Sequence, residues 1–144
     1  SYDFVKKGIE DALKEVPKEK LINAVPFYTR LWKEVEKTAE ELEEQEGTDA
    51  AEYPYKVTSE AYGMSKIHIA IENAGAKVKV DKATGQNYAE WVAGDATYKV
   101  WLEDEEALEA KLKLMKEHDL AGVAAWRLGF EKSDIWELIL KYVN

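Results

Sequence analysis

The chain has 144 residues, of which 46% are hydrophobic and 34% charged, as is ordinary for one soluble globular domain. A formal net charge of −9 argues against binding to nucleic acid or to an anionic membrane surface, because both need clustered lysine and arginine. No apolar run approaches the roughly 20 residues that span a bilayer. The chain has no cysteine and only two histidines, far apart, so we expect neither a metal nor a cofactor.

The first part of the sequence predicts a helix and then a buried strand. Apolar residues recur at helical spacing from Phe4 to Val16, with Asp3 placed to cap the start and Pro17 to end the helix. Residues 21–28 are almost continuously apolar, which is typical of a strand buried on both faces.

The middle of the chain is more polar. From residue 32 to residue 47 we predict an acidic surface helix, on the basis of a narrow apolar stripe formed by Trp32, Val35, Ala39 and Leu42. A loop from 47 to 55 leads to a short strand at 56–58 and a helix at about 65–74. Three alternating segments then predict an antiparallel meander, with strands at residues 77–80, 88–92 and 97–101.

The last third predicts a helix at about 105–118, a buried strand at 120–126 and a final helix at 133–143. The acidic run Glu103–Glu106 lies at the start of the first of these helices, where acids stabilise the helix dipole. We interpret it in that way rather than as a catalytic pair or a calcium site.

The chain contains, in this order, the segments Val25–Arg30, 56–101, Trp101–Asp104 and Ala121–Trp126. Together they resemble glycoside hydrolase family 18, the chitinase and spore-cortex glycosidase family. Val25-Pro-Phe-Tyr-Thr-Arg30 is similar to the end of the family's seventh barrel strand, with Thr29 in place of the commoner Gly. Residues 56–101 resemble its α+β insertion domain. Trp101-Leu-Glu-Asp104 is similar to the segment before helix seven, and Ala121-Gly-Val-Ala-Ala-Trp126 to strand eight.

The resemblance implies an α/β fold: the C-terminal portion of a TIM (β/α)8 barrel, with strands 7 and 8, flanking helices and an inserted small α+β domain. We assign residues 1–33 and 103–144 to the barrel portion and 34–102 to the acidic helix, loop and insertion. A whole barrel needs roughly 250 residues, so these 144 residues cannot form one. The family's Asp-x-x-Asp-x-Asp-x-Glu motif, whose Glu is the general acid, matches no window of this sequence. We therefore expect no catalytic residue here, and no activity of the chain alone.

The same resemblance implies four substrate-binding residues. Trp126, at the end of the strand 120–126, would form the sugar-stacking floor of the site, although an indole there can also be plain core packing. Tyr28 and Arg30 point to one face and would hydrogen-bond to the sugar, or else lay their apolar stems over the barrel rim. Trp101 would contribute a wall of the groove, with cross-strand packing as the alternative.

We expect the parent protein to hydrolyse β-1,4-linked N-acetylglucosamine polymers, either cortex peptidoglycan or chitin. The alternatives are a non-catalytic glycan- or protein-binding module and a fragment without a function of its own. The implied partners are the polysaccharide and the remainder of the barrel. The implied location is extracellular, in the cell wall or in the spore coat or cortex, although the sequence does not open with a signal peptide.

A two-stranded piece of a barrel also leaves unpaired edges, so we expect a homo-oligomer. In that expectation, four apolar side chains lose their barrel partners, namely Ile22, Val25, Val123 and Ala125.

Overall fold

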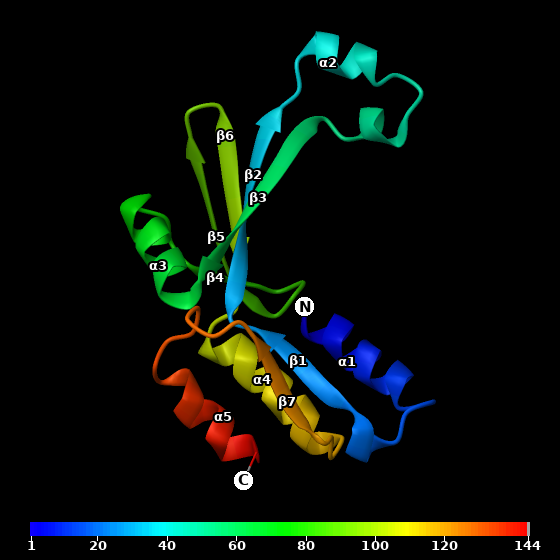
Figure 1. Cartoon of the computed structure of the whole chain (residues 1–144). Helices are drawn as coiled ribbons and strands as arrows, with labels where there is room; N and C mark the ends of the chain where they lie inside the picture. The colour runs from blue at the N-terminus through cyan, green and yellow to red at the C-terminus, as the bar shows by residue number, and fades with distance from the viewer. Residues whose placement is uncertain (144) are drawn as a thin grey trace.

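The computed structural model describes residues 1–143 as two parts joined end to end (Figure 1). The first part has a parallel pair of strands, β1 (Ile22–Pro26) and β7 (Gly122–Trp126), as the sequence predicts. Three helices belong to it: α1 (Tyr2–Ala12), α4 (Glu105–Glu117) and α5 (Ile135–Val143). The α/β class predicted from the sequence is confirmed.

The parallel pair is buried on one face only. Val25 lies on that face in a core with α4 and α5, whose buried members are Val25, Phe27, Met64, Leu108, Leu112, Ile135 and Ile139. Val123 and Ala125 pack against the same core. The expectation that Val25, Val123 and Ala125 share an open face with Ile22 is therefore wrong, because successive strand residues point to opposite faces. Ile22 lies on the opposite face and is 56% exposed.

The second part is an antiparallel sheet of five strands in the order β3-β2-β6-β5-β4. Its strands are β2 (Tyr28–Glu36), β3 (Tyr55–Gly63), β4 (Lys79–Asp81), β5 (Gln86–Ala93) and β6 (Ala96–Trp101). Helix α3 (Met64–Asn73) covers one face, where the core consists of Leu31, Ile67, Ile71, Ala89, Val100 and Leu102. The predicted meander and the helix that precedes it are thus confirmed.

The surface helix predicted from residue 32 is wrong over its first part. Residues 32–36 continue β2, which pairs with β3 on one side and with β6 on the other. In that strand Thr29 and Leu31 are buried while Arg30 and Trp32 are exposed, which is the period of two that a strand requires. Cross-strand pairing decides the conformation here, since Trp32 and Val35, which a helix would place on one stripe, point to opposite faces of β2.

The helix that does form, α2 (Ala39–Glu44), begins at a capping box. The Thr38 hydroxyl accepts a hydrogen bond from the Glu41 amide at 3.3 Å, and the Glu41 carboxylate accepts one from the Thr38 amide at 2.9 Å. The predicted loop after it contains one short 3-10 turn, η2 (Asp49–Glu52). A second 3-10 turn, η1 (Lys18–Lys20), precedes β1. Figure 1 shows α2 and η2 at the tip of a long arm formed by β2 and β3.

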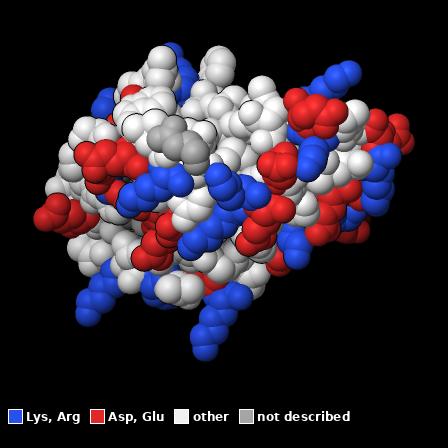
Figure 2. Space-filling model, turned by 90° about the horizontal axis from the view of Figure 1, so that it is seen from below, with Lys and Arg blue, Asp and Glu red and all other residues white. Residues whose placement is uncertain are grey.

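No helix within residues 1–143 is long and apolar enough to cross a membrane. On the face shown in Figure 2, basic and acidic side chains are interspersed, and no broad basic patch is visible.

Candidate functional site

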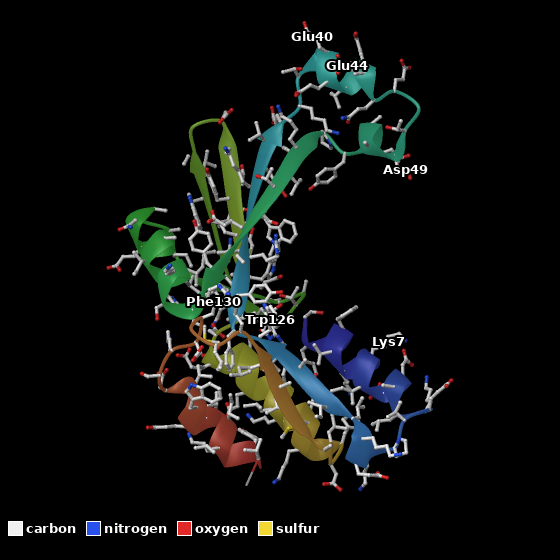
Figure 3. All side chains as sticks on the ribbon, in the orientation of Figure 1. Lys7, Glu40, Glu44, Asp49, Trp126 and Phe130 are labelled. Carbon is white, nitrogen blue, oxygen red and sulfur yellow. The ribbon has the colours of Figure 1, made fainter. Side chains whose placement is uncertain are left out.

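Trp126 ends β7 with its side chain outside the core. The residue is 68% exposed, and its carbonyl accepts a hydrogen bond from the Phe27 amide at 2.7 Å. The bond from Trp126 to Arg127 is a cis peptide. Figure 3 places Trp126 at the junction between the two parts of the molecule, whereas Glu40 and Asp49 lie far away on the arm. Trp126 is therefore free to contact a ligand, and core packing does not account for it.

Strand β2 carries the next two predicted residues on the sheet face that α3 leaves uncovered. Tyr28 and Arg30 are two positions apart, and Trp32 continues the same face. The Arg30 guanidinium donates two hydrogen bonds to the Ser59 hydroxyl, at 3.0 and 2.8 Å, and lies 5.9 Å from the centre of the Trp32 ring. These contacts fix the Arg30 side chain across the sheet rather than along the rim.

Trp101 reaches the same face from β6. Its ring packs on Tyr88 with centroids 4.7 Å apart, and its indole N–H donates to the Asp81 carboxylate at 2.8 Å. That hydrogen bond, together with those from Thr84 and the Ala83 amide, lowers the pKa of Asp81. Trp101 is thus both packed across the strands and held in one orientation.

Trp91, the tryptophan of β5, does not contribute to this face of the sheet. It stacks on Tyr98 with centroids 5.4 Å apart and an interplanar angle of 7°. Both rings pack against the core beneath α3, on the opposite face of the sheet. Cross-strand aromatic packing therefore explains Trp91.

Three of the four predicted residues line one open pocket of about 200 Å³. These are Tyr28, Arg30 and Trp101, and the remaining lining residues are Pro26, Thr29, Trp32, Gln86 and Glu103. Trp126 does not line this pocket. It lies beside it, because its Cα pairs with that of Pro26 across the parallel strands.

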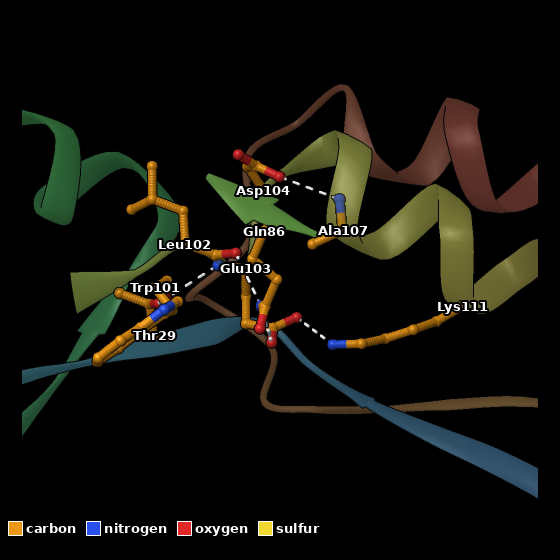
Figure 4. A network of polar contacts seen from close by, with 8 residues as sticks. All are labelled: Thr29, Gln86, Trp101, Leu102, Glu103, Asp104, Ala107 and Lys111. Carbon is orange, nitrogen blue, oxygen red and sulfur yellow. Dashed lines mark hydrogen bonds and ion pairs between the residues drawn. The ribbon is translucent and has the colours of Figure 1, made fainter. Parts of the chain in front are cut away.

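A polar network forms the wall of the pocket where the sheet meets α4 (Figure 4). The Glu103 amide donates to the Thr29 hydroxyl at 3.2 Å, and one carboxylate oxygen of Glu103 accepts from the Gln86 side-chain amide at 3.1 Å. The other carboxylate oxygen is paired with the ammonium of Lys111, a residue that is 5% exposed. The pair joins the end of the sheet unit to the middle of α4.

Sequence reasoning missed Gln86, Glu103 and Lys111. The signal for Lys111 was present, because a lysine occurs on the apolar stripe of α4 among Leu108, Leu112 and Met115. A charge at a core position needs a partner. The acidic run before α4 could have supplied one. Asp104, the second residue of that run, caps the helix by accepting a hydrogen bond from the Ala107 amide at 3.0 Å, which agrees with the predicted place of the run at a helix start.

The chemistry available here is recognition. Flat aromatic faces and hydrogen-bonding groups converge, a combination that suits a ligand with apolar and hydroxyl-bearing surfaces. The one carboxylate in the pocket wall, Glu103, is neutralised by Lys111. Within residues 1–143 no cluster of three or more histidines and carboxylates is arranged to hold a metal ion.

A parallel strand pair flanked by helices, with a five-stranded sheet inserted between its strands along the chain, is the arrangement expected of part of a (β/α)8 barrel. Residues 3–131 match the model of the family described as Glycosyl hydrolases family 18. The chain therefore belongs to that family, and the resemblance seen in the sequence is confirmed.

Two curated relatives come from Bacillus subtilis (strain 168). One is the uncharacterized glycosylase YvbX, 23% identical over 142 residues, which are 98% of this chain and 36% of the relative. The other is a cortical fragment-lytic enzyme, 26% identical over 144 residues, with 97% of this chain and 29% of the relative covered. The chain thus spans about a third of the length of each.

The solved structure of a chitinase from Chromobacterium violaceum ATCC 12472 shares the fold. Its TM-score is 0.75 at 20% identity, and the match covers 99% of this chain and 38% of the chitinase. That match and the family model confirm the barrel-derived fold class predicted from the sequence.

Proposed function

We propose that this chain forms one side of the groove by which a family 18 glycosidase binds β-1,4-linked N-acetylglucosamine polymers. The observation that carries the proposal is the position of Trp126, an exposed indole at the C-terminal end of a barrel strand. Next to it lies the pocket with Tyr28, Arg30 and Trp101. In this proposal Trp126 is the sugar platform and the other three line the groove.

The polymer is cortex peptidoglycan or chitin. A curated relative named for cortical fragments favours the former, and a chitinase with the same fold the latter. Acting on either polymer would place the parent protein outside the cell, in a cell wall or in a spore cortex. We also propose the division into a barrel portion and an inserted α+β domain. The boundary expected after residue 33 is here moved to Tyr28, because β2 pairs with β3 from that residue onwards.

Binding can be tested with N-acetylchitotetraose by isothermal titration calorimetry. We expect saturable binding to the chain, and binding about tenfold weaker for Trp126→Ala, because a stacking surface is lost. Trp126→Phe should keep much of the affinity. Val92→Ala is the control, since Val92 is 72% exposed on a distant hairpin. Equal affinities of the unmutated chain and of Trp126→Ala for the sugar would exclude Trp126 as the platform.

A specific observation favours a second candidate, a glycan-binding module without catalysis: the 144 residues contain no Asp-x-x-Asp-x-Asp-x-Glu motif. We expect the chain alone to release no fluorogenic aglycone from a chitobioside above the rate in buffer. Release above that rate would show that the residues present supply a general acid, and would refute this part of the proposal.

A further inference from the structure

The Gln86 side chain is held in one orientation at the edge of the pocket. Gln86 is 9% exposed, and its amide nitrogen donates to the Leu102 carbonyl at 3.3 Å and to the Glu103 carboxylate at 3.1 Å. An NH₂ group has two hydrogens, and both of its acceptors are fixed parts of the junction. The amide can therefore not rotate by 180° without placing its carbonyl oxygen against two other oxygens.

The orientation of Glu103 is set in turn by Lys111. The Lys111 side chain is 6% exposed and that of Glu103 is 16% exposed, so the ion pair is shielded from water. The Glu103 amide is held by Thr29, as described above. The Gln86 amide is thus fixed directly by two groups of the segment after β6, the Leu102 carbonyl and the Glu103 carboxylate, and indirectly by one group each from β2 and α4.

The carbonyl oxygen of Gln86 has no hydrogen-bond donor within residues 1–143. Among residues 1–143, Asn23 Nδ2 is the one fully buried side-chain polar atom that lacks a partner. The unpartnered Gln86 oxygen is therefore not fully buried and stays accessible to solvent. Gln86 is also a lining residue of the pocket that contains Tyr28, Arg30 and Trp101. Its oxygen is therefore an unpaired acceptor, fixed in orientation, on a residue at the edge of the candidate groove.

We propose that Gln86 is a specificity-determining residue whose carbonyl oxygen accepts a hydrogen bond from the bound sugar. Since both amide hydrogens are engaged, the residue can only accept, and it selects a ligand that presents a donor at this point. Two groups of an N-acetylglucosamine polymer supply such a donor, the acetamido N–H and a ring hydroxyl. This inference rests on the proposed glycan-binding function.

The test compares N-acetylchitotetraose with cellotetraose, in which hydroxyls replace the acetamido groups. The variant Gln86→Met keeps the length of the side chain and removes the acceptor, and Gln45→Met on the arm is the matched control. We expect Gln86→Met to bind N-acetylchitotetraose roughly two- to tenfold more weakly, as the loss of one hydrogen bond predicts. A loss confined to this sugar assigns the donor to the acetamido N–H, and equal losses for both sugars assign it to a hydroxyl.

Unchanged affinity of Gln86→Met for the sugars that the parent chain binds would overturn the inference and leave the proposed function standing. If the unmutated chain binds neither N-acetylchitotetraose nor cellotetraose, both the proposed function and the inference about Gln86 are overturned. Because Gln86→Met could destabilise the junction, the parent chain provides a second measurement. The ¹³Cδ resonance of Gln86 should shift on saturation with N-acetylchitotetraose, and a resonance that stays in place would also overturn the inference.

Discussion

The two sheets of the molecule expose their uncovered faces in different ways. Within residues 1–143 the parallel sheet consists of two strands of five residues each, and it exposes Ile22 and Trp126 on its open face. On the open face of the five-stranded sheet, by contrast, charged groups are paired, as in the ion pair of Lys99 with Glu34 at 2.6 Å. The first face exposes apolar side chains without paired charges beside them, whereas the second combines paired charges with exposed apolar side chains such as Val57 and Val92. The difference indicates that the open face of the parallel pair depends more on a further partner than that of the five-stranded sheet.

The largest expected effect concerns the residue that joins the two parts, Phe27. It is fully buried between β1 and β2, and its ring meets Trp136 edge-on at 5.5 Å. Phe27→Ala should lower the free energy of unfolding by about 4 kcal/mol, because it leaves a cavity in the core beneath the parallel pair. Urea unfolding monitored by circular dichroism measures the loss.

The same variant tests whether the two parts differ in stability. We expect amide hydrogen exchange in Phe27→Ala to accelerate more in β1 and β7 than in β5 and β6. Ile67→Ala, in the core beneath α3, is the reciprocal variant and should accelerate exchange in β5 and β6. Uniform acceleration in both variants would show that the two parts unfold as one cooperative unit.

The second prediction concerns the ion pair at the junction. Lys111→Met should destabilise the protein by about 3 kcal/mol, because Glu103 then keeps a shielded charge without its partner. Lys113→Met on the same helix is the control, since Lys113 pairs with Glu109 at the surface and its loss should cost less than about 1 kcal/mol.

A double variant separates the charge from the packing. Adding Glu103→Gln to Lys111→Met removes the unpaired carboxylate, so we expect part of the lost stability to return. Additive losses from the two substitutions would show that the pair contributes no coupling energy.

How far the sequence predicts this fold depends on the range of the interactions. Helix α4 and strand β7 were predictable because their apolar patterns are local. The course of residues 32–36 was not, because their stripe fits a helix and only pairing with β3 and β6 makes them a strand. The partial burial of β7 follows from a similar cause, since a run of apolar residues does not show how many faces will find a partner.

The site divides in the same manner. The family motifs indicated Trp126, Tyr28, Arg30 and Trp101, and the structure brings three of these into one pocket with Trp126 beside it. Gln86 is on another strand, and no local pattern distinguishes it from a surface glutamine. Its fixed orientation depends on contacts across 16 and 17 residues of sequence, which only the folded chain shows.

The third prediction is self-association through the parallel pair. Ile22 is exposed on the open face, and Phe4 of the neighbouring helix α1 is 80% exposed. We therefore propose that two copies associate over this surface at micromolar concentration. Sedimentation equilibrium should show species above 16.4 kDa, and Ile22→Lys should shift the distribution towards the monomer. Val80→Lys, at a comparably exposed position of the other sheet, should leave the distribution unchanged.

The smallest expected effect is a pH dependence at Trp101. Asp81 has a lowered pKa because its carboxylate accepts hydrogen bonds first from the Trp101 indole and then from Thr84 and the Ala83 amide. A depressed pKa in the folded state contributes stability above the ordinary value of about 3.9, and that stability is lost as the pH falls through the lowered pKa.

The indole N–H resonance of Trp101 reports this titration directly, whereas total stability also includes other carboxylates with lowered pKa values, such as Glu109 and Asp119. We expect the resonance to be constant above about pH 4 and to shift below it, with a midpoint under the ordinary aspartate value. Asp81→Asn keeps an acceptor for the indole but cannot titrate, so its Trp101 resonance should not move. A midpoint at or above 3.9 in the parent chain, or the same shift in Asp81→Asn, would show that the hydrogen bond does not control the ionisation of Asp81. Trp101 would then be held by its packing on Tyr88 alone, and the open face of the five-stranded sheet would depend less on paired charges than its contacts indicate.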